Sequence, residues 1–186
     1  MTQLFSGKEV SESVYESLIP KIQSLKSHGV IPGLAAILVG EDPASRVYVR
    51  SKARRFESLN LFTETIRLDA DISQDKLVSK IRNINTDDRF HGILVQLPLP
   101  KHIDDNEIIN IVNPMKDVDG FSPENVGFLT IGNPRFIPCT PKGIMRILSH
   151  YDVDLSGKHV VIIGRSNIVG RPVSILTSLK KSFCNA

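Results

Sequence analysis

Leu34-Ala35-Ala36-Ile37-Leu38-Val39 is an unbroken apolar run, and Gly40-Glu41-Asp42-Pro43 follows it directly. The run predicts a strand that is buried on both faces, as in a parallel sheet covered by helices. Glycine, aspartate and proline together favour a turn, so we expect a helix to start near Ala44-Ser45. A buried strand that leads through a short turn into a helix is the repeating unit of an α/β fold.

Apolar runs and helical repeats alternate on both sides of this unit. Ser6-Gly7-Lys8-Glu9 has the spacing of a capping box and opens a helix that should reach about Gly29, with a kink at Pro20. Further along, we expect strands at residues 61–68, 92–97 and 159–163, and helices at residues 74–84, 105–111, from 140 and 172–179. The pattern therefore predicts an α/β protein with a mainly parallel sheet.

The composition is typical of a soluble globular protein. Of 186 residues, 41% are hydrophobic and 23% are charged, and no apolar run approaches the roughly 20 residues that span a bilayer. The N-terminus lacks the pattern of a secretory signal, so we expect a cytoplasmic protein. Cys139 and Cys184 form no Cys-x-x-Cys pair, which indicates reduced thiols. The net charge of +3 suits an anionic small molecule as well as nucleic acid.

Tyr48 and Lys52 are the first candidates for chemistry. On a helix, residues four apart lie one turn apart on the same face, so an aromatic ring and an amine would meet there. A partly buried lysine can give and take a proton near neutral pH. Two alternatives stay open: a solvated basic helix, which Arg50, Arg54 and Arg55 favour, and a nucleic-acid surface, for which no recognisable module is present.

Two further candidates are an amide and a carboxylate. Gln96 lies at the end of the predicted strand at residues 92–97, where α/β sheets place ligands, and it could orient a lysine or only hydrogen-bond the turn. Asp117-Val118-Asp119-Gly120 lacks the other acidic positions of a calcium loop, so we predict no metal site. A carboxylate in this loop could accept hydrogen bonds from a planar heterocycle, and a turn-forming aspartate is the alternative.

The string Gly164-Arg165-Ser166-Asn167-Ile168-Val169-Gly170 stands between a predicted strand and a predicted helix. That context favours phosphate binding at a helix N-terminus. Serine and valine replace two glycines of the Gly-x-Gly-x-x-Gly pattern, so the motif is weak by itself and a structural turn is the alternative. Arg165 favours a 2′-phosphate, and hence NADP over NAD.

Several strings follow one another in a fixed order along the chain. They are residues 39–45, Tyr48-Val49 with Lys52, residues 96–100, Lys116-Asp117-Val118-Asp119-Gly120-Phe121, Pro138-Cys139-Thr140-Pro141, and Gly164-Arg165-Ser166 with Val169-Gly170. In this order they resemble the bifunctional methylenetetrahydrofolate dehydrogenase/cyclohydrolase family over essentially the whole chain. Such an ordered set is far more specific than any one of its members.

The resemblance implies an enzyme that oxidises 5,10-methylenetetrahydrofolate with NADP and hydrolyses the methenyl product to 10-formyltetrahydrofolate. By its match to the family motif, Lys52 would handle the proton in the cyclohydrolase step, and Gln96 would position it. Tyr48 would stack on the folate rings, Ser45 would contribute to the substrate site, and Asp119 would bind the pterin.

For the cofactor, the resemblance implies that Gly164, Arg165 and Ser166 bind the NADP phosphates. It also implies a catalytic α/β domain at residues 1–122, followed at residues 123–186 by a linker helix and the start of a Rossmann-like NADP-binding domain. Asn185-Ala186 is similar to the opening of a further family strand, so we expect a C-terminally truncated chain and a homodimer when it is full length.

The partners that the resemblance implies are one-carbon derivatives of tetrahydrofolate, including polyglutamylated ones, whose polyanionic tail suits the mildly basic chain. No nucleic acid or membrane partner is expected. The alternatives are a folate-binding fragment without turnover and another NADP-linked oxidoreductase. One departure from the family is Asn60, which stands where glycine is common.

Overall fold

The computed structural model describes residues 3–179, and the chain divides into two compact units. The sheet unit contains residues 21–118. The helical unit contains residues 1–20 and 119–186, of which 3–20 and 119–179 are described. The helical unit therefore draws on two separate parts of the chain. The predicted domain ranges, 1–122 and 123–186, are each continuous in sequence and stay a prediction.

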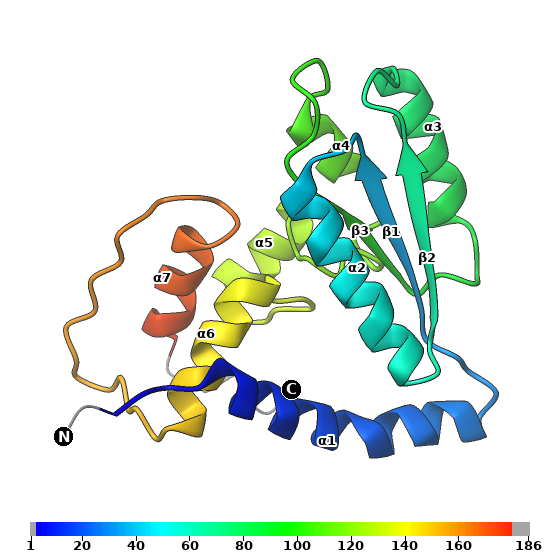
Figure 1. The fold of residues 1–186 in the computed structure, drawn as a ribbon. Helices are drawn as coiled ribbons and strands as arrows, with labels where there is room; N and C mark the ends of the chain where they lie inside the picture. Colours follow the sequence, from blue (N-terminus) through cyan, green and yellow to red (C-terminus); the bar gives the residue numbers. More distant parts are fainter. Residues whose placement is uncertain (1–2, 180–186) are drawn as a thin grey trace. The chain divides into compact units, whose positions relative to one another are not determined.

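The core of the sheet unit is a parallel three-stranded sheet in the order β2-β1-β3 (Figure 1). β1 (Gly33–Val39) lies between β2 (Phe62–Leu68) and β3 (Gly92–Val95), and every residue of β1 is buried. The predicted α/β class and parallel sheet are thereby confirmed. β3 ends at Val95 rather than at residue 97, since the chain turns towards Pro98, which has no N–H to continue a ladder.

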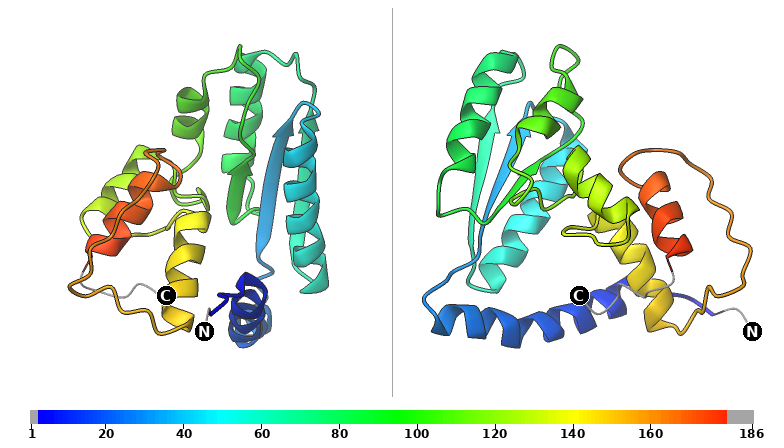
Figure 2. Two further views of the ribbon diagram at one scale, coloured as in Figure 1. Left: turned by 60° about the vertical axis from the view of Figure 1, so that its left-hand side comes forward. Right: turned by 180° about the vertical axis from the view of Figure 1, so that it is seen from behind.

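Helices cover both faces of this sheet (Figures 1 and 2). They are α2 (Pro43–Ser58), α3 (Gln74–Asn85) and α4 (Asp105–Ile111). On the α2 side, Ala36 and Leu38 of β1 pack with Val49. On the side of α3 and α4, Ala35 and Ile37 join a larger apolar cluster. Because side chains alternate between the two faces of a strand, the one apolar run contributes to the cores on both faces of the sheet. Burial of each large apolar side chain stabilises the fold by roughly 1.5–3 kcal/mol.

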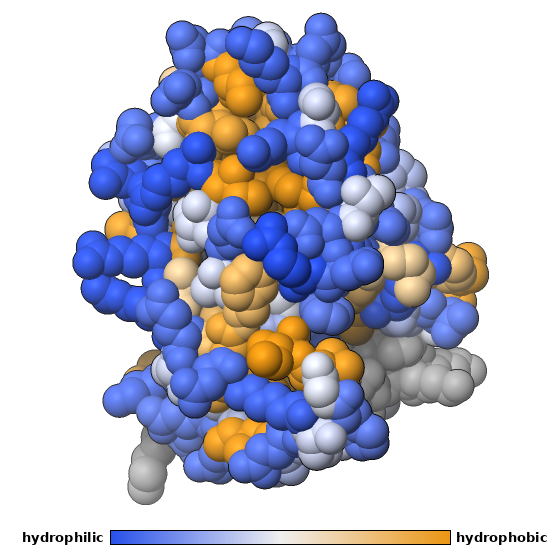
Figure 3. Space-filling view, turned by 90° about the vertical axis from the view of Figure 1, so that its right-hand side faces the viewer, coloured by the Kyte–Doolittle hydropathy of each residue, from blue (hydrophilic) through white to orange (hydrophobic). Residues whose placement is uncertain are grey.

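β2 forms one edge of the sheet. Glu64 and Arg67, both on this strand, are exposed to solvent. Figure 3 shows the molecule from the side of β2 and α3, where hydrophobic patches are separated by hydrophilic side chains. Charged side chains on an edge strand oppose pairing with another chain, which explains why an apolar sheet can keep this edge uncovered.

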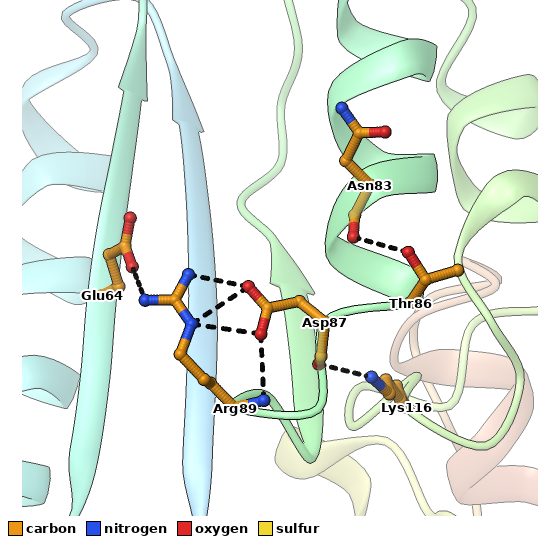
Figure 4. A network of polar contacts seen from close by, with 6 residues as sticks. All are labelled: Glu64, Asn83, Thr86, Asp87, Arg89 and Lys116. Atoms are coloured by element: carbon orange, nitrogen blue, oxygen red, sulfur yellow. Dashed lines mark hydrogen bonds and ion pairs between the residues drawn. The ribbon is translucent and has the colours of Figure 1, made fainter.

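The turn between α3 and β3 is held by a polar network (Figure 4). Arg89 donates from Nε and Nη2 to the Asp87 carboxylate, at 3.1 and 2.7 Å, and lies 3.8 Å from Glu64 of β2. Lys116 Nζ donates to the Asp87 carbonyl oxygen at 2.9 Å. The hydrogen bond from Arg89 lowers the pKa of the Asp87 carboxyl. Three segments of the sheet unit therefore meet at this turn.

The helical unit contains short helices. They are α5 (Pro123–Thr130), α6 (Cys139–His150) and α7 (Gly170–Ser178), and α7 contacts both of the others. α1 (Gly7–Ser27) begins in this unit, continues through Pro20 and ends in the sheet unit. Of the helices formed by residues 3–179, none has the length and apolar character needed to cross a bilayer.

The predicted strand at residues 159–163 is wrong. The structure gives this segment no regular secondary structure and leaves Val161 and Ile163 72% and 101% exposed. A strand requires a neighbour to accept and donate its backbone hydrogen bonds, and the described part of the helical unit contains no strand. The apolar run alone therefore could not produce a sheet here.

Candidate active site

The start of α2 is fixed by Asp42. Its Oδ2 accepts a hydrogen bond from Ser45 N at 2.7 Å, and Pro43 occupies the first turn, where its missing N–H costs nothing. The hydrogen bond from the Ser45 backbone lowers the pKa of the Asp42 carboxyl below its ordinary value of 3.8. The helix therefore begins at a defined residue directly beyond the carboxyl end of β1.

Protonation of Asp42 should weaken this cap. A carboxyl whose pKa is lowered by folding stabilises the fold above its ordinary pKa, and the contribution is lost as pH falls through the lower, folded value. Asp42→Asn keeps an N-cap acceptor but cannot titrate. We expect its urea midpoint to fall less than that of the parent between about pH 6 and about pH 3, measured by far-UV circular dichroism. Parallel pH profiles would contradict this role of Asp42.

Lys52, the candidate lysine, lies on the side of α2 that faces the sheet and is partly buried. Ser45 and Val49 are 4% and 2% exposed, and Lys52 follows them on the same side of the helix and is half-buried. Tyr48 lies at the margin of this side and is 63% exposed. Within residues 3–179, Lys52 forms no hydrogen bond or ion pair. The arrangement leaves an exposed aromatic ring one turn from a partly covered amine.

Gln96 is the first residue after β3. Its N–H donates to the Ile37 carbonyl oxygen at 2.9 Å, which carries the β1–β3 ladder one step further. Alternate residues of a strand face the same side of the sheet, so Gln96 faces the same side as Gly92 and Leu94. Leu94 pairs with Ala36, and Ala36 packs against Val49 of α2. Gln96 therefore lies at the carboxyl edge, on the sheet face that α2 covers. In this structure its Nε2 donates to the Leu97 carbonyl oxygen at 2.8 Å, as the turn-binding alternative predicts.

The segment that contains the aspartates lies along the free side of β3. Ile93 N donates to the Lys116 carbonyl oxygen at 2.7 Å, and Ile93 and Asp117 form a parallel bridge. A Cβ on Gly92 would lie 2.5 Å from Val118 Cγ1, so glycine is what allows this close approach. Asp117 is 5% exposed, whereas Asp119 is half-buried. Asp119 is thus the more accessible carboxylate of the two.

The loop from Gly164 to Gly170 closes tightly before α7. A Cβ on Gly170 would lie 2.4 Å from the Gly164 carbonyl oxygen. Ser166 Oγ accepts hydrogen bonds from Val169 N and Gly170 N at 3.1 and 3.3 Å, where Val169 is the N-cap residue of α7. Arg165 is exposed. Two positions of the loop favour glycine: Gly164 has a φ of +140°, and Gly170 leaves no room for a Cβ. Gly170 was not among the predicted cofactor residues, although it is the last glycine of the string.

The predicted site residues are divided between the two units. The sheet unit contains Ser45, Tyr48, Lys52 and Gln96, with the first three on α2 and the fourth at the end of β3. The helical unit contains Asp119, Gly164, Arg165 and Ser166. The structure therefore groups the proposed proton-handling residues separately from the proposed cofactor residues.

Two domains of one known protein family match most of this chain in sequence. Residues 5–119 match the catalytic domain of tetrahydrofolate dehydrogenase/cyclohydrolase, and residues 138–185 match the NAD(P)-binding domain of the same family. The chain belongs to the tetrahydrofolate dehydrogenase/cyclohydrolase family. The family resemblance seen in the sequence is thereby confirmed, as is the start of an NAD(P)-binding domain after the α/β catalytic domain.

Relatives within the tetrahydrofolate dehydrogenase/cyclohydrolase family are similar in sequence and in fold. The bifunctional protein FolD of Streptococcus pyogenes is 52% identical over 95% of this chain, which spans 62% of that relative's length. The crystal structure of FolD from Campylobacter jejuni has a TM-score of 0.91 at 48% identity and covers 94% of this chain and 62% of its own. FolD from Trypanosoma brucei, solved with NADP and an inhibitor, has a TM-score of 0.89 at 34% identity, with coverages of 92% and 59%.

Proposed function

We propose that this chain carries the folate site of a bifunctional methylenetetrahydrofolate dehydrogenase/cyclohydrolase. The complete reaction would oxidise 5,10-methylenetetrahydrofolate with NADP and hydrolyse 5,10-methenyltetrahydrofolate to 10-formyltetrahydrofolate. The observation that supports it most is the pairing on α2 of exposed Tyr48 with half-buried Lys52, at a sheet whose carboxyl edge also holds Gln96. Membership of the tetrahydrofolate dehydrogenase/cyclohydrolase family supports the proposed oxidation and hydrolysis.

The cyclohydrolase step is within the chemistry of these side chains. Water adds to the methenyl carbon, and Lys52 Nζ in its neutral form would take a proton from that water. The carbon–N5 bond then breaks, the hydroxyl proton goes to N5, and one proton is released to solvent per turnover. The Gln96 amide would orient the Lys52 amine, and the exposed ring of Tyr48 would stack on the substrate's aromatic rings.

The loop before α7 fits a phosphate-bearing cofactor. When bound, NADP would accept the hydride from the methylene carbon. The backbone at Gly164 and Ser166 and the exposed Arg165 guanidinium would bind its phosphates, and arginine matches the 2′-phosphate that distinguishes NADP from NAD. The close contact of Gly170 with the Gly164 carbonyl keeps the loop compact at the helix N-terminus. We also propose that the full-length enzyme is a homodimer and is cytoplasmic.

The decay of methenyltetrahydrofolate absorbance tests this function directly. This step needs no nicotinamide, so the 186-residue chain can be compared with the buffer rate. Faster decay would support a folate site formed by this chain. Tight folate binding without faster decay would identify a binding fragment, and neither binding nor decay would contradict the proposal for this chain.

Asp119→Ala is expected to weaken folate binding. Loss of a carboxylate that accepts hydrogen bonds from the pterin should raise the Kd roughly 10- to 100-fold, because hydrogen bonds to charged groups contribute about 1.5–3 kcal/mol. Isothermal titration calorimetry with 5-formyltetrahydrofolate measures this. Asp71→Ala removes an exposed carboxylate from the sheet unit and serves as the control. Retained affinity in Asp119→Ala would place the pterin contact on another residue.

A further inference from the structure

Lys116 opens the string that contains Asp119, and the proposed reaction assigns it no role. Its side chain is half-buried, and its Nζ donates to the Asp87 carbonyl oxygen at 2.9 Å. Its main chain is bonded as well, because its carbonyl oxygen accepts from Ile93 N at 2.7 Å and its N–H donates to the Asn113 carbonyl oxygen at 2.8 Å. Lys116 therefore joins the turn before β3, the strand itself and the segment that follows α4.

Asn85, at the end of α3, holds the beginning of the same segment. Its Nδ2 donates to the Ile111 carbonyl oxygen at 2.7 Å, and its Oδ1 accepts from Asn113 N at 2.9 Å. These two bonds lie on either side of Val112, the C-cap residue of α4. Asn113 Oδ1 in turn accepts from Met115 N at 2.9 Å. One side-chain amide therefore fixes the direction in which the chain leaves α4.

The segment at residues 112–118 depends on these side chains for its position. It forms no helix, and its one bridge joins Asp117 to Ile93. Because that bridge is parallel, the segment runs beside β3 towards the edge of the sheet that holds Gln96, and Asp119 is the next residue of the chain. Misplacement of a group that touches the substrate by about 1 Å can cost roughly a hundredfold. The bonds of the segment should therefore affect how well Asp119 meets a ligand.

The direction of the Lys116 side chain favours positioning over contact with the substrate. Figure 4 shows its amine directed at the Asp87 carbonyl oxygen, in the turn before β3. Gln96 follows the other end of this four-residue strand, and a rise of about 3.3 Å per residue separates the two ends by roughly 10 Å. The Lys116 amine is therefore bonded at the end of β3 that is remote from Gln96.

We propose that Lys116 and Asn85 are positioning residues for folate binding, which hold the backbone that leads to Asp119. The inference rests on the proposed function, because it takes Asp119 as the contact to the pterin. It adds two residues that determine how well this contact is made without touching the substrate themselves.

The first test measures the Kd of 5-formyltetrahydrofolate by calorimetry. Lys116→Met removes the bond to Asp87 and should raise the Kd roughly tenfold. Lys116→Arg keeps a charged donor and should have a Kd close to that of the parent. Lys26→Met is the matched control, because Lys26 is also half-buried and its Nζ donates to the Leu59 carbonyl oxygen at 3.0 Å. An unchanged Kd in Lys116→Met, or an equal rise in Lys26→Met, overturns the proposal.

A double-mutant cycle shows whether Lys116 acts through Asp119. The variant Lys116→Met/Asp119→Ala should bind folate as weakly as Asp119→Ala alone, because there is no carboxylate left to position. A further rise in the Kd of the double variant would mean that Lys116 acts independently of Asp119, which overturns the proposal. Asn85→Ala removes the two bonds at the beginning of the segment and should give the same pattern, so it decides the question if Lys116→Met does not fold.

Amide hydrogen exchange measured by NMR tests the positioning without a ligand. The Ile93 amide donates to the Lys116 carbonyl oxygen, and the Met115 amide donates to Asn113 Oδ1. Both should exchange roughly tenfold faster in Lys116→Met and at the parent rate in Lys26→Met. If the parent binds no folate, the proposed function fails, while these exchange rates still decide whether Lys116 holds the segment. Unchanged exchange in Lys116→Met overturns its positioning role.

Discussion

Lys52→Met is expected to slow hydrolysis of methenyltetrahydrofolate by about 10²- to 10⁴-fold, the usual contribution of a positioned proton-transfer group. Methionine has a similar length and fills the half-buried space beside Val49, but it cannot accept a proton. Folate affinity should change little, because Tyr48 and Asp119 are the proposed binding residues. The rate is measured from the absorbance decay, and the affinity by calorimetry with 5-formyltetrahydrofolate.

Two controls separate this chemical role of Lys52 from a general effect on charge or folding. Lys80→Met removes the same charge from an exposed position on α3, on the opposite face of the sheet, and should hydrolyse at the parent rate. Equal urea midpoints for the parent and Lys52→Met would show that the fold is intact. Normal hydrolysis by Lys52→Met would remove Lys52 from the mechanism.

Local chemistry was sufficient to predict most elements of the sheet unit. The apolar run at residues 34–39 forms β1, and Asp104 caps α4 by accepting from Asn106 N and Glu107 N. Asn60, which stands where glycine is common in the family, has a φ of +51°, a left-handed conformation that asparagine tolerates better than most residues. The strand at residues 34–39 and the helix at residues 105–111 depend on neighbours in sequence and were predicted, whereas the left-handed conformation of Asn60 was not.

Features that depend on distant partners were not predictable in the same way. The segment at residues 159–163 has a strand pattern but no partner strand within the described residues. α5 is a different case: it was missed although its signals are local, since Ser122 accepts from Asn125 N and Pro123 opens the first turn. The half-burial of Lys52 follows from how α2 packs on β1 and β2, which no sequence period specifies.

Gly33→Ala is expected to destabilise the sheet unit by about 3 kcal/mol or more, at the upper end of what overpacking costs. A Cβ at this position would lie 2.0 Å from the Arg89 carbonyl oxygen, and main-chain atoms cannot move aside as a flexible side chain can. Gly33 is also bound to His91 through both its N–H and its carbonyl oxygen, at 3.1 and 2.8 Å. Urea unfolding followed by far-UV circular dichroism measures the loss.

Gly143→Ala is the matched control for the Gly33 substitution. Gly143 lies within α6, and a Cβ there would meet no atom within 4 Å. Alanine should stabilise the helix by roughly 0.5–1 kcal/mol because it has less backbone freedom to lose on folding. A similar midpoint for the parent and Gly33→Ala would contradict the steric explanation.

A double-mutant cycle shows whether the rigidity of the Arg89 turn causes the penalty at Gly33. The bonds from Arg89 to the Asp87 carboxylate hold this turn in place. Asp87→Ala removes them, so the Arg89 carbonyl could move away from an added methyl group. The loss caused by Gly33→Ala should therefore be smaller in the Asp87→Ala background, with a coupling of roughly 0.5–3 kcal/mol. If the two stability losses simply add, the Asp87 carboxylate does not restrict movement of the turn. The cost of Gly33→Ala would then arise within β1 itself.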